Sequence, residues 1–147
     1  MIKKIIMNIK FYEQTNVNLS KRKVLKKFIA SIFLNEGKVL GGLTIIFCTD
    51  NYLLQINKDF LQHDYFTDII TFDLSESNTS SIIGEIYISV ERVKENAATN
   101  QSSFHKELHT VIFHGALHLC GYADKTESEY LTMAIKQDEY YKMYINF

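Results

Sequence analysis

Proline is absent from the 147 residues, and only two cysteines, Cys48 and Cys120, occur. Without proline, every turn depends on Gly, Asn, Asp and Ser. Both cysteines lie in apolar segments and form no C-x-x-C pair, so we expect buried, reduced thiols. This cysteine usage fits a reducing cytosol, and we expect a cytoplasmic protein.

Long apolar runs and a surplus of one charge are also missing. No run approaches the roughly 20 residues that a helix needs to cross a bilayer. The N-terminal stretch meets Asn8, Lys10 and Glu13 too early for a secretory signal. The formal net charge is −1. A nucleic-acid partner must therefore bind a local basic patch, because the protein as a whole is not basic.

The remaining composition, 46% hydrophobic and 22% charged, is that of an ordinary globular protein. We expect residues 1–147 to form a single domain. Hydrophobic periodicity predicts strands at 2–12, 43–49, 67–74 and 82–90, and helices at about 21–36, 50–61, 91–99, 102–120 and 127–144. These elements predict an α+β (mixed α/β) fold, with a single-layer mixed β-sheet of about four strands covered by about five helices.

Capping signals support several of these boundaries. Ser20 is a candidate N-cap for the first helix, and Gly37 follows its end. Thr126 and Glu129 form a T-x-x-E capping box before the last helix. The short connection at 75–81 permits an antiparallel pair of strands.

The stretch HGALHLCGYAD, at 114–124, carries the main chemical signal. On a helix, His114 and His118 lie one turn apart on the same face. Gly121 permits a turn that returns Asp124 toward them. The resulting H-x3-H-x5-D set suits zinc or a neighbouring first-row metal and leaves a coordination position open, as catalytic sites do. The alternative is that both histidines are satisfied core residues.

A second H-x3-H pair, His105 and His109, precedes the first on the same predicted helix. At about 100° per residue it lies about half a turn away, and no glycine turn or third ligand follows it. We interpret His105 as a surface residue and His109 as a core residue or a support for the ligands.

Several segments in a fixed order resemble one protein family. The H-G-x-L-H-L-x-G-Y stretch with its ligand at the eleventh position resembles the signature of the YbeY family of bacterial metal-dependent endoribonucleases. TDIITF (67–72) resembles the family's T-D-V-L-S-F, GEIYIS (84–89) its G-D-I-x-I-S, and the segment FHKELHTVIFHG its F-x-x-E-L. Asn57 stands at the family's upstream asparagine. The resemblance covers roughly residues 45–125.

The resemblance implies a single-strand-specific endoribonuclease that acts in maturation of small-subunit rRNA and in ribosome quality control. It implies one divalent metal ion, Zn²⁺ in the first place, and hydrolysis by a metal-activated water. The implied partners are single-stranded rRNA, the small ribosomal subunit, a ribosomal protein and an assembly GTPase, with no membrane.

Two departures from the family pattern bear on the site. Asp124 occupies the position of the family's third histidine, and this harder, more anionic set could shift the preference toward Mn or Fe. Leu61 replaces the family's arginine, so another cation must take its place. The candidates are Arg92, Lys58 and Lys125.

We assign His114, His118 and Asp124 as metal ligands, with Asp68 or Glu107 as a base or orienting group. Asp68 could equally be a turn or cap residue at a strand start. A metzincin-like peptidase is the rival enzyme, but Gly115 stands where such an enzyme carries its general base. The other alternative is a non-catalytic ribosome-assembly factor with a structural metal.

RNA contacts have two sources in the sequence. Five of the 16 Lys and Arg residues lie within 21–27, either as a phosphate-facing stripe or, as the charge pattern favours, as a solvated helix face. Phe60, Tyr65 and Phe66 are candidates for stacking on unpaired bases.

Overall fold

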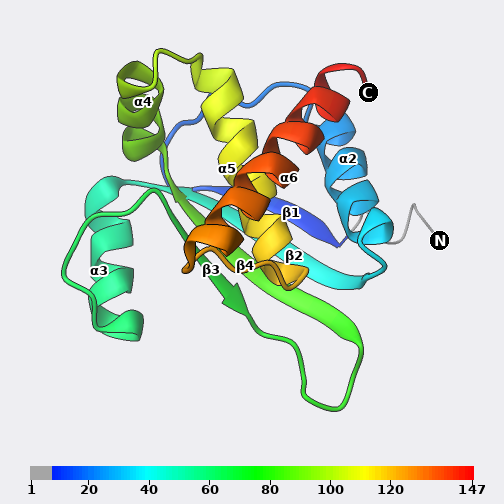
Figure 1. The fold of residues 1–147 in the computed structure, drawn as a ribbon. Helices are drawn as coiled ribbons and strands as arrows, with labels where there is room; N and C mark the ends of the chain where they lie inside the picture. Colours follow the sequence, from blue (N-terminus) through cyan, green and yellow to red (C-terminus); the bar gives the residue numbers. More distant parts are fainter. Residues whose placement is uncertain (1–7) are drawn as a thin grey trace.

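The computed structural model describes residues 8–147, and it confirms the predicted mixed fold of four strands and five helices (Figure 1). The strands are β1 (Ile9–Glu13), β2 (Val39–Cys48), β3 (Ile69–Asp73) and β4 (Ser81–Ser89). The helices are α2 (Arg22–Asn35), α3 (Asp50–Leu61), α4 (Val90–Thr99), α5 (Phe104–Leu119) and α6 (Glu127–Ile145). Of the first predicted strand, residues 2–7 lie outside the described part.

The sheet has the order β1-β2-β4-β3. β1 pairs with β2, and β2 with β4, in parallel, whereas β3 runs antiparallel to β4. The expected antiparallel pair across the polar loop is therefore confirmed. No helix within residues 8–147 combines the length and apolarity that a membrane crossing requires.

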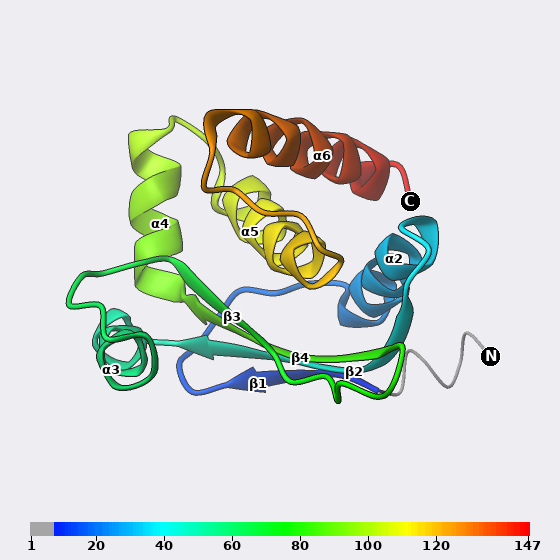
Figure 2. The same ribbon diagram turned by 60° about the horizontal axis from the view of Figure 1, so that its bottom comes forward.

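The helices divide unequally between the two faces of the sheet. α2, α4, α5 and α6 lie on one side, as Figure 2 shows. Ile45 and Phe47 of β2 belong to the large core on that side. Cys48, which points the other way along the same strand, packs with Leu53 of α3 and Ile70 of β3 in a smaller cluster.

Two glycines let α5 lie directly on the sheet. A Cβ at Gly115 would lie 2.8 Å from Ile86 Cδ1, and a Cβ at Gly84 would lie 2.6 Å from Leu119 Cδ1. Both distances are too short for a carbon contact, so a larger residue at either position would have to displace the Ile86 or the Leu119 side chain. The face of α5 that carries Gly115 is therefore occupied by the sheet, and its other faces remain for contacts with other elements.

The cap predictions were partly right. Thr126 accepts a hydrogen bond from the Glu129 backbone N–H, as expected. Ser20 as an N-cap is wrong: the N-cap is Lys21, whose φ of 53° is left-handed and whose side chain forms no cap bond. Helix α2 ends at Asn35, and Gly37 follows with a φ of 69°, as predicted.

Candidate metal centre

The structure brings His114, His118 and Asp124 together at one end of α5. The Nε2 atoms of both histidines lie 3.3 Å from Asp124 Oδ2. One ligand atom from each of the three residues lies within 4.8 Å of the others. The three side chains are 19%, 27% and 35% exposed, so solvent reaches them.

The other ring nitrogen of each histidine is engaged. His118 Nδ1 donates to the Tyr122 carbonyl oxygen at 2.8 Å, and His114 Nδ1 donates to Gln137 Oε1 at 2.9 Å. Protons on both Nδ1 atoms leave both Nε2 lone pairs directed toward Asp124. Metal-binding histidines are commonly oriented and made more basic in this way.

The donor set fits a divalent cation. Tetrahedral zinc with ligands at about 2.0–2.1 Å separates neighbouring ligand atoms by about 3.3–3.4 Å, the spacing found here between each Nε2 and Oδ2. Two imidazole nitrogens and a carboxylate oxygen are ligand types that zinc binds, and a cation between them would contact all three.

A network behind the ligands holds the turn that follows α5. Gly121 has a φ of 106°, which turns the chain back toward the histidines. The hydroxyls of Tyr122 and Tyr140 donate to the two carboxylate oxygens of Glu36, at 3.0 and 2.9 Å. Burial and the bond to Glu36 raise the pKa of both tyrosines, so the hydroxyls stay protonated as donors. The turn is thereby tied to the end of α2 and to α6.

The ligands open into a cavity of about 810 Å³. Asp68 and Glu107 also line it, so the structure places both candidate bases beside the ligands. Asn96 Nδ2 donates to Asp68 Oδ2 at 3.3 Å, and Asn100 Nδ2 donates to Glu107 Oε1 at 3.1 Å. Burial raises the pKa of Asp68. The Asp68 carbonyl also accepts from the Ser89 backbone N–H, so its backbone has a structural role as well.

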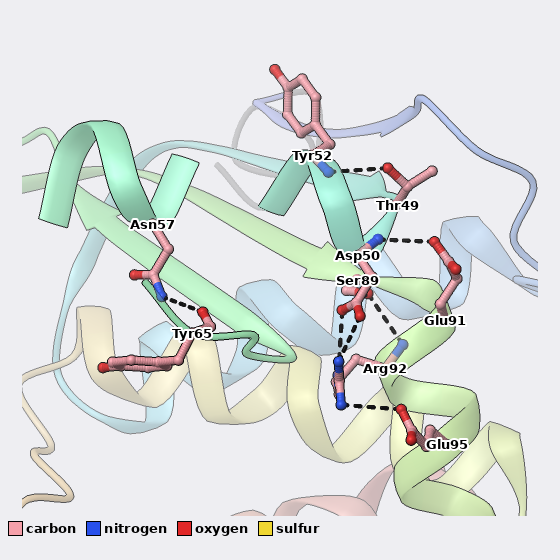
Figure 3. A network of polar contacts seen from close by, with 9 residues as sticks. All are labelled: Thr49, Asp50, Tyr52, Asn57, Tyr65, Ser89, Glu91, Arg92 and Glu95. Carbon is pink, nitrogen blue, oxygen red and sulfur yellow. Dashed lines mark hydrogen bonds and ion pairs between the residues drawn. The ribbon is translucent and has the colours of Figure 1, made fainter. Parts of the chain in front are cut away.

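The three candidate cations differ in their surroundings. Arg92 lies in an ion pair with Asp50 at 2.6 Å and another with Glu95 at 3.1 Å (Figure 3). Lys58 pairs with Asp64. Lys125 is exposed, and within the described residues it is the one Lys or Arg that lines the cavity.

The basic cluster at 21–27 does not line the cavity. Arg22 pairs with Glu13 at 3.1 Å, and Lys26 Nζ lies 5.3 Å from the centre of the Phe11 ring. These contacts agree with the solvated helix face that the charge pattern favours.

The rival histidine pair lies elsewhere on α5. His105 is exposed, whereas His109 is 1% exposed and packs its ring 4.9 Å from that of Tyr144. Burial lowers the pKa of His109 to about 4. The interpretation of His105 as surface and His109 as core is therefore correct. Gly115, the position of a peptidase base, faces Ile86 and so cannot serve the cavity.

Sequence reasoning missed Gln137 and Glu36. Gln137 lies on α6, far along the chain from His114, and no local motif marks it. The buried residues of α6 include Met133, Tyr140 and Tyr144. A polar residue at helical spacing within that stripe was the available signal. Glu36 stands just after α2 without a comparable pattern.

Known proteins resemble this chain over most of its length. Residues 7–145 match the family model described as Endoribonuclease YbeY. A relative named Endoribonuclease YbeY from Cytophaga hutchinsonii is 48% identical over 87% of this chain and 89% of its own. One of the same name from Flavobacterium psychrophilum is 47% identical over 80% and 82%. The solution structure of a protein from Thermotoga maritima superposes with a TM-score of 0.60 and 32% identity over 90% of this chain and 85% of that one.

Proposed function

The chain belongs to the Endoribonuclease YbeY family, and from this premise we propose that residues 1–147 form one domain that hydrolyses single-stranded RNA at the metal centre. The observation that carries the proposal is the convergence of His114 Nε2, His118 Nε2 and Asp124 Oδ2. Their arrangement leaves room on the cavity side for a further ligand, as a hydrolytic site requires.

The proposed cofactor is one divalent ion, Zn²⁺ in the first place, held by His114, His118 and Asp124. When bound, it would polarise a phosphoryl oxygen and lower the pKa of a bound water toward about 7. The carboxylate of Asp124 is a harder ligand than imidazole, which keeps Mn and Fe as alternatives. The variant Asp124→His should shift relative affinity from Mn²⁺ toward Zn²⁺, measured by competitive titration.

The remaining cavity residues have proposed roles in binding and proton transfer. Lys125 is the proposed contact for a substrate phosphate, because it lines the cavity and belongs to none of the ion pairs found within residues 8–147. An Asp68 carboxylate oxygen is the proposed acceptor for the proton of the attacking water, with Asn96 fixing the carboxylate. Glu107, which receives a bond from Asn100, is the alternative acceptor.

The proposed biological substrate is single-stranded rRNA of the small ribosomal subunit. Proposed partners are a ribosomal protein and an assembly GTPase, in the cytoplasm. Family membership supports these assignments, and the test is copurification of pre-ribosomal particles with the tagged protein and accumulation of unprocessed small-subunit rRNA when the protein is depleted.

The activity test compares the metal-loaded protein with Asp124→Ala and Asp68→Asn on a short single-stranded RNA. We expect cleavage by the wild type, its loss on chelation, loss of metal and cleavage in Asp124→Ala, and loss of cleavage with metal retained in Asp68→Asn. Casein should stay intact, because no carboxylate occupies the peptidase position at Gly115. A wild type that holds metal and binds RNA without cutting it would favour the assembly-factor alternative.

A further inference from the structure

An aromatic surface lines the same cavity as the metal ligands. It consists of His63 and Tyr65, in the loop between α3 and β3. Their ring centroids lie 5.1 Å apart with the planes inclined by 19°, and a hydrogen bond of 2.9 Å joins the Tyr65 hydroxyl and His63 Nδ1. Tyr65 remains 56% exposed. The two rings therefore support each other while leaving a flat aromatic face to solvent.

The backbone that carries these rings is held by a buried asparagine. Asn57 is 2% exposed, and its Nδ2 donates to the Tyr65 carbonyl at 2.9 Å, as Figure 3 shows. The His63 backbone N–H donates to the Asn57 carbonyl at 3.0 Å. Asn57 thus holds the backbone of both aromatic residues. The hydrogen bond to the Tyr65 carbonyl also explains why a polar side chain is buried in α3.

The next residue along the loop, Phe66, makes a cation–π contact. The Arg92 guanidinium lies 5.0 Å from the centre of the Phe66 ring, and Asp50 fixes that guanidinium at 2.6 Å. Figure 3 places the Tyr65 ring pointing away from the Arg92 cluster. Because His63, Tyr65 and Phe66 each make a hydrogen bond or a cation–π contact, less conformational freedom remains to be lost in this loop when a ligand binds.

The charges in the cavity favour an uncharged contact with RNA. Four acidic residues line the cavity: Asp68, Asp73, Glu107 and Asp124. Among the described residues, Lys125 is the one Lys or Arg in the lining. Phosphates beyond the metal centre therefore find little positive charge. Stacking of bases on aromatic rings supplies affinity without charge and tolerates any base, since every base has a π-face.

We infer that His63 and Tyr65 form a subsite for one unpaired base next to the cleaved phosphate. The inference rests on the proposed endoribonuclease function and extends it to substrate selection. A base in a duplex is covered by its neighbours and cannot reach the rings, whereas a base in a single strand can splay out and stack. The subsite thus provides a physical reason for single-strand specificity.

The test uses metal-loaded protein and a short single-stranded RNA whose cleaved bond is first located by mass spectrometry. The base on each side of that bond is then replaced in turn by an abasic nucleotide. Binding is followed by fluorescence anisotropy of labelled RNA, and KM and kcat are measured separately. The variants are Tyr65→Leu, Tyr65→Phe and, as a control, Tyr12→Leu, whose aromatic side chain is 63% exposed on β1 outside the cavity.

We expect Tyr65→Leu to raise Kd and KM by about 5- to 150-fold, the usual value of one stacked base, with kcat and metal content unchanged. One of the two abasic substrates should show the same loss with the wild type and no further loss with Tyr65→Leu. Tyr65→Phe keeps the ring and should stay within about 3-fold of the wild type, as should Tyr12→Leu.

Two results would overturn the inference. One is an unchanged Kd and KM in a folded Tyr65→Leu protein, and the other is an abasic penalty that is equal in the wild type and Tyr65→Leu. Either result with cleavage intact leaves the proposed function standing. If the wild type binds RNA but does not cut it, the proposed function fails while the Kd values still test the stacking subsite.

Discussion

Helix α5 carries two histidine pairs with identical spacing and opposite fates. His105 and His109 stack on each other, with centroids 4.0 Å apart, and His109 packs into the aromatic core. His114 and His118 both lie beside Asp124, and the Nδ1 atom of each forms a hydrogen bond. Both side chains line the cavity. Spacing on a helix therefore brings two imidazoles together, but a metal site also needs a third ligand, acceptors behind the rings and access for solvent.

The largest expected effect comes from breaking the second pair. His118→Ala removes one of three ligands, so metal affinity should fall by more than about 100-fold, beyond the usual cost of losing a supporting bond. RNA cleavage should disappear with it. Metal content after dialysis and thermal unfolding of the metal-free proteins measure the effect and show that the fold survives. A His118→Ala protein that retains stoichiometric metal contradicts the assignment.

The support behind His114 provides a finer test. Gln137→Leu removes the acceptor for His114 Nδ1, which should lower metal affinity by about 10- to 100-fold. Gln137→Glu keeps an oxygen in place and should retain affinity near that of the wild type. Zinc titration against a competing chelator measures both, and equal losses in the two variants would show that the hydrogen bond is not what matters.

In the pair His105 and His109, we expect His109 to affect the stability of the protein at acidic pH. The folded-state pKa of His109 is about 4, below the ordinary value of about 6.5, so the unfolded state binds more protons between these values. Protonation of His109 therefore does not affect the free energy of unfolding above about pH 6.5, and it lowers that free energy as the pH falls toward 4. His109→Leu should remove about 2 kcal/mol of the decline in unfolding free energy between pH 6.5 and 5. Urea unfolding of the metal-free proteins at both pH values measures it, and identical declines would contradict the expectation.

The smallest effect is expected at His105. Its exposed ring contacts Tyr141 through a hydrogen bond of 3.2 Å, so His105→Ala should change unfolding free energy by less than about 1 kcal/mol. Metal content and RNA cleavage should equal those of the wild type. A clear loss of metal in His105→Ala would erase the distinction between the two pairs.

Much of this arrangement was predictable because it depends on local pattern. Helix α3 runs from Asp50 to Leu61 as its periodicity predicted, and Thr49 caps it. The turn at Gly121 follows from a residue that tolerates a positive φ. The local pattern wrongly predicted Ser20 as the N-cap of α2. The N-cap is Lys21 in a left-handed conformation, which the preferences of lysine do not predict.

The unpredicted parts depend on contacts between distant segments. Gln137 reaches His114 only because α6 packs against α5, and Glu36 meets Tyr122 only because the end of α2 lies beside the ligand turn. Tyr65 was recognisable as a candidate for stacking. Its partner His63 became apparent only with the loop that Asn57 holds.

The most direct test of the central claim is to locate the metal by anomalous diffraction from crystals of the protein loaded with Zn²⁺. The account predicts one strong peak bound by His114 Nε2, His118 Nε2 and the Asp124 carboxylate, with Gln137 and the Tyr122 carbonyl still bonded to the Nδ1 atoms. A peak at His105, or three side chains in the arrangement described here with no peak between them at saturating zinc, would contradict it.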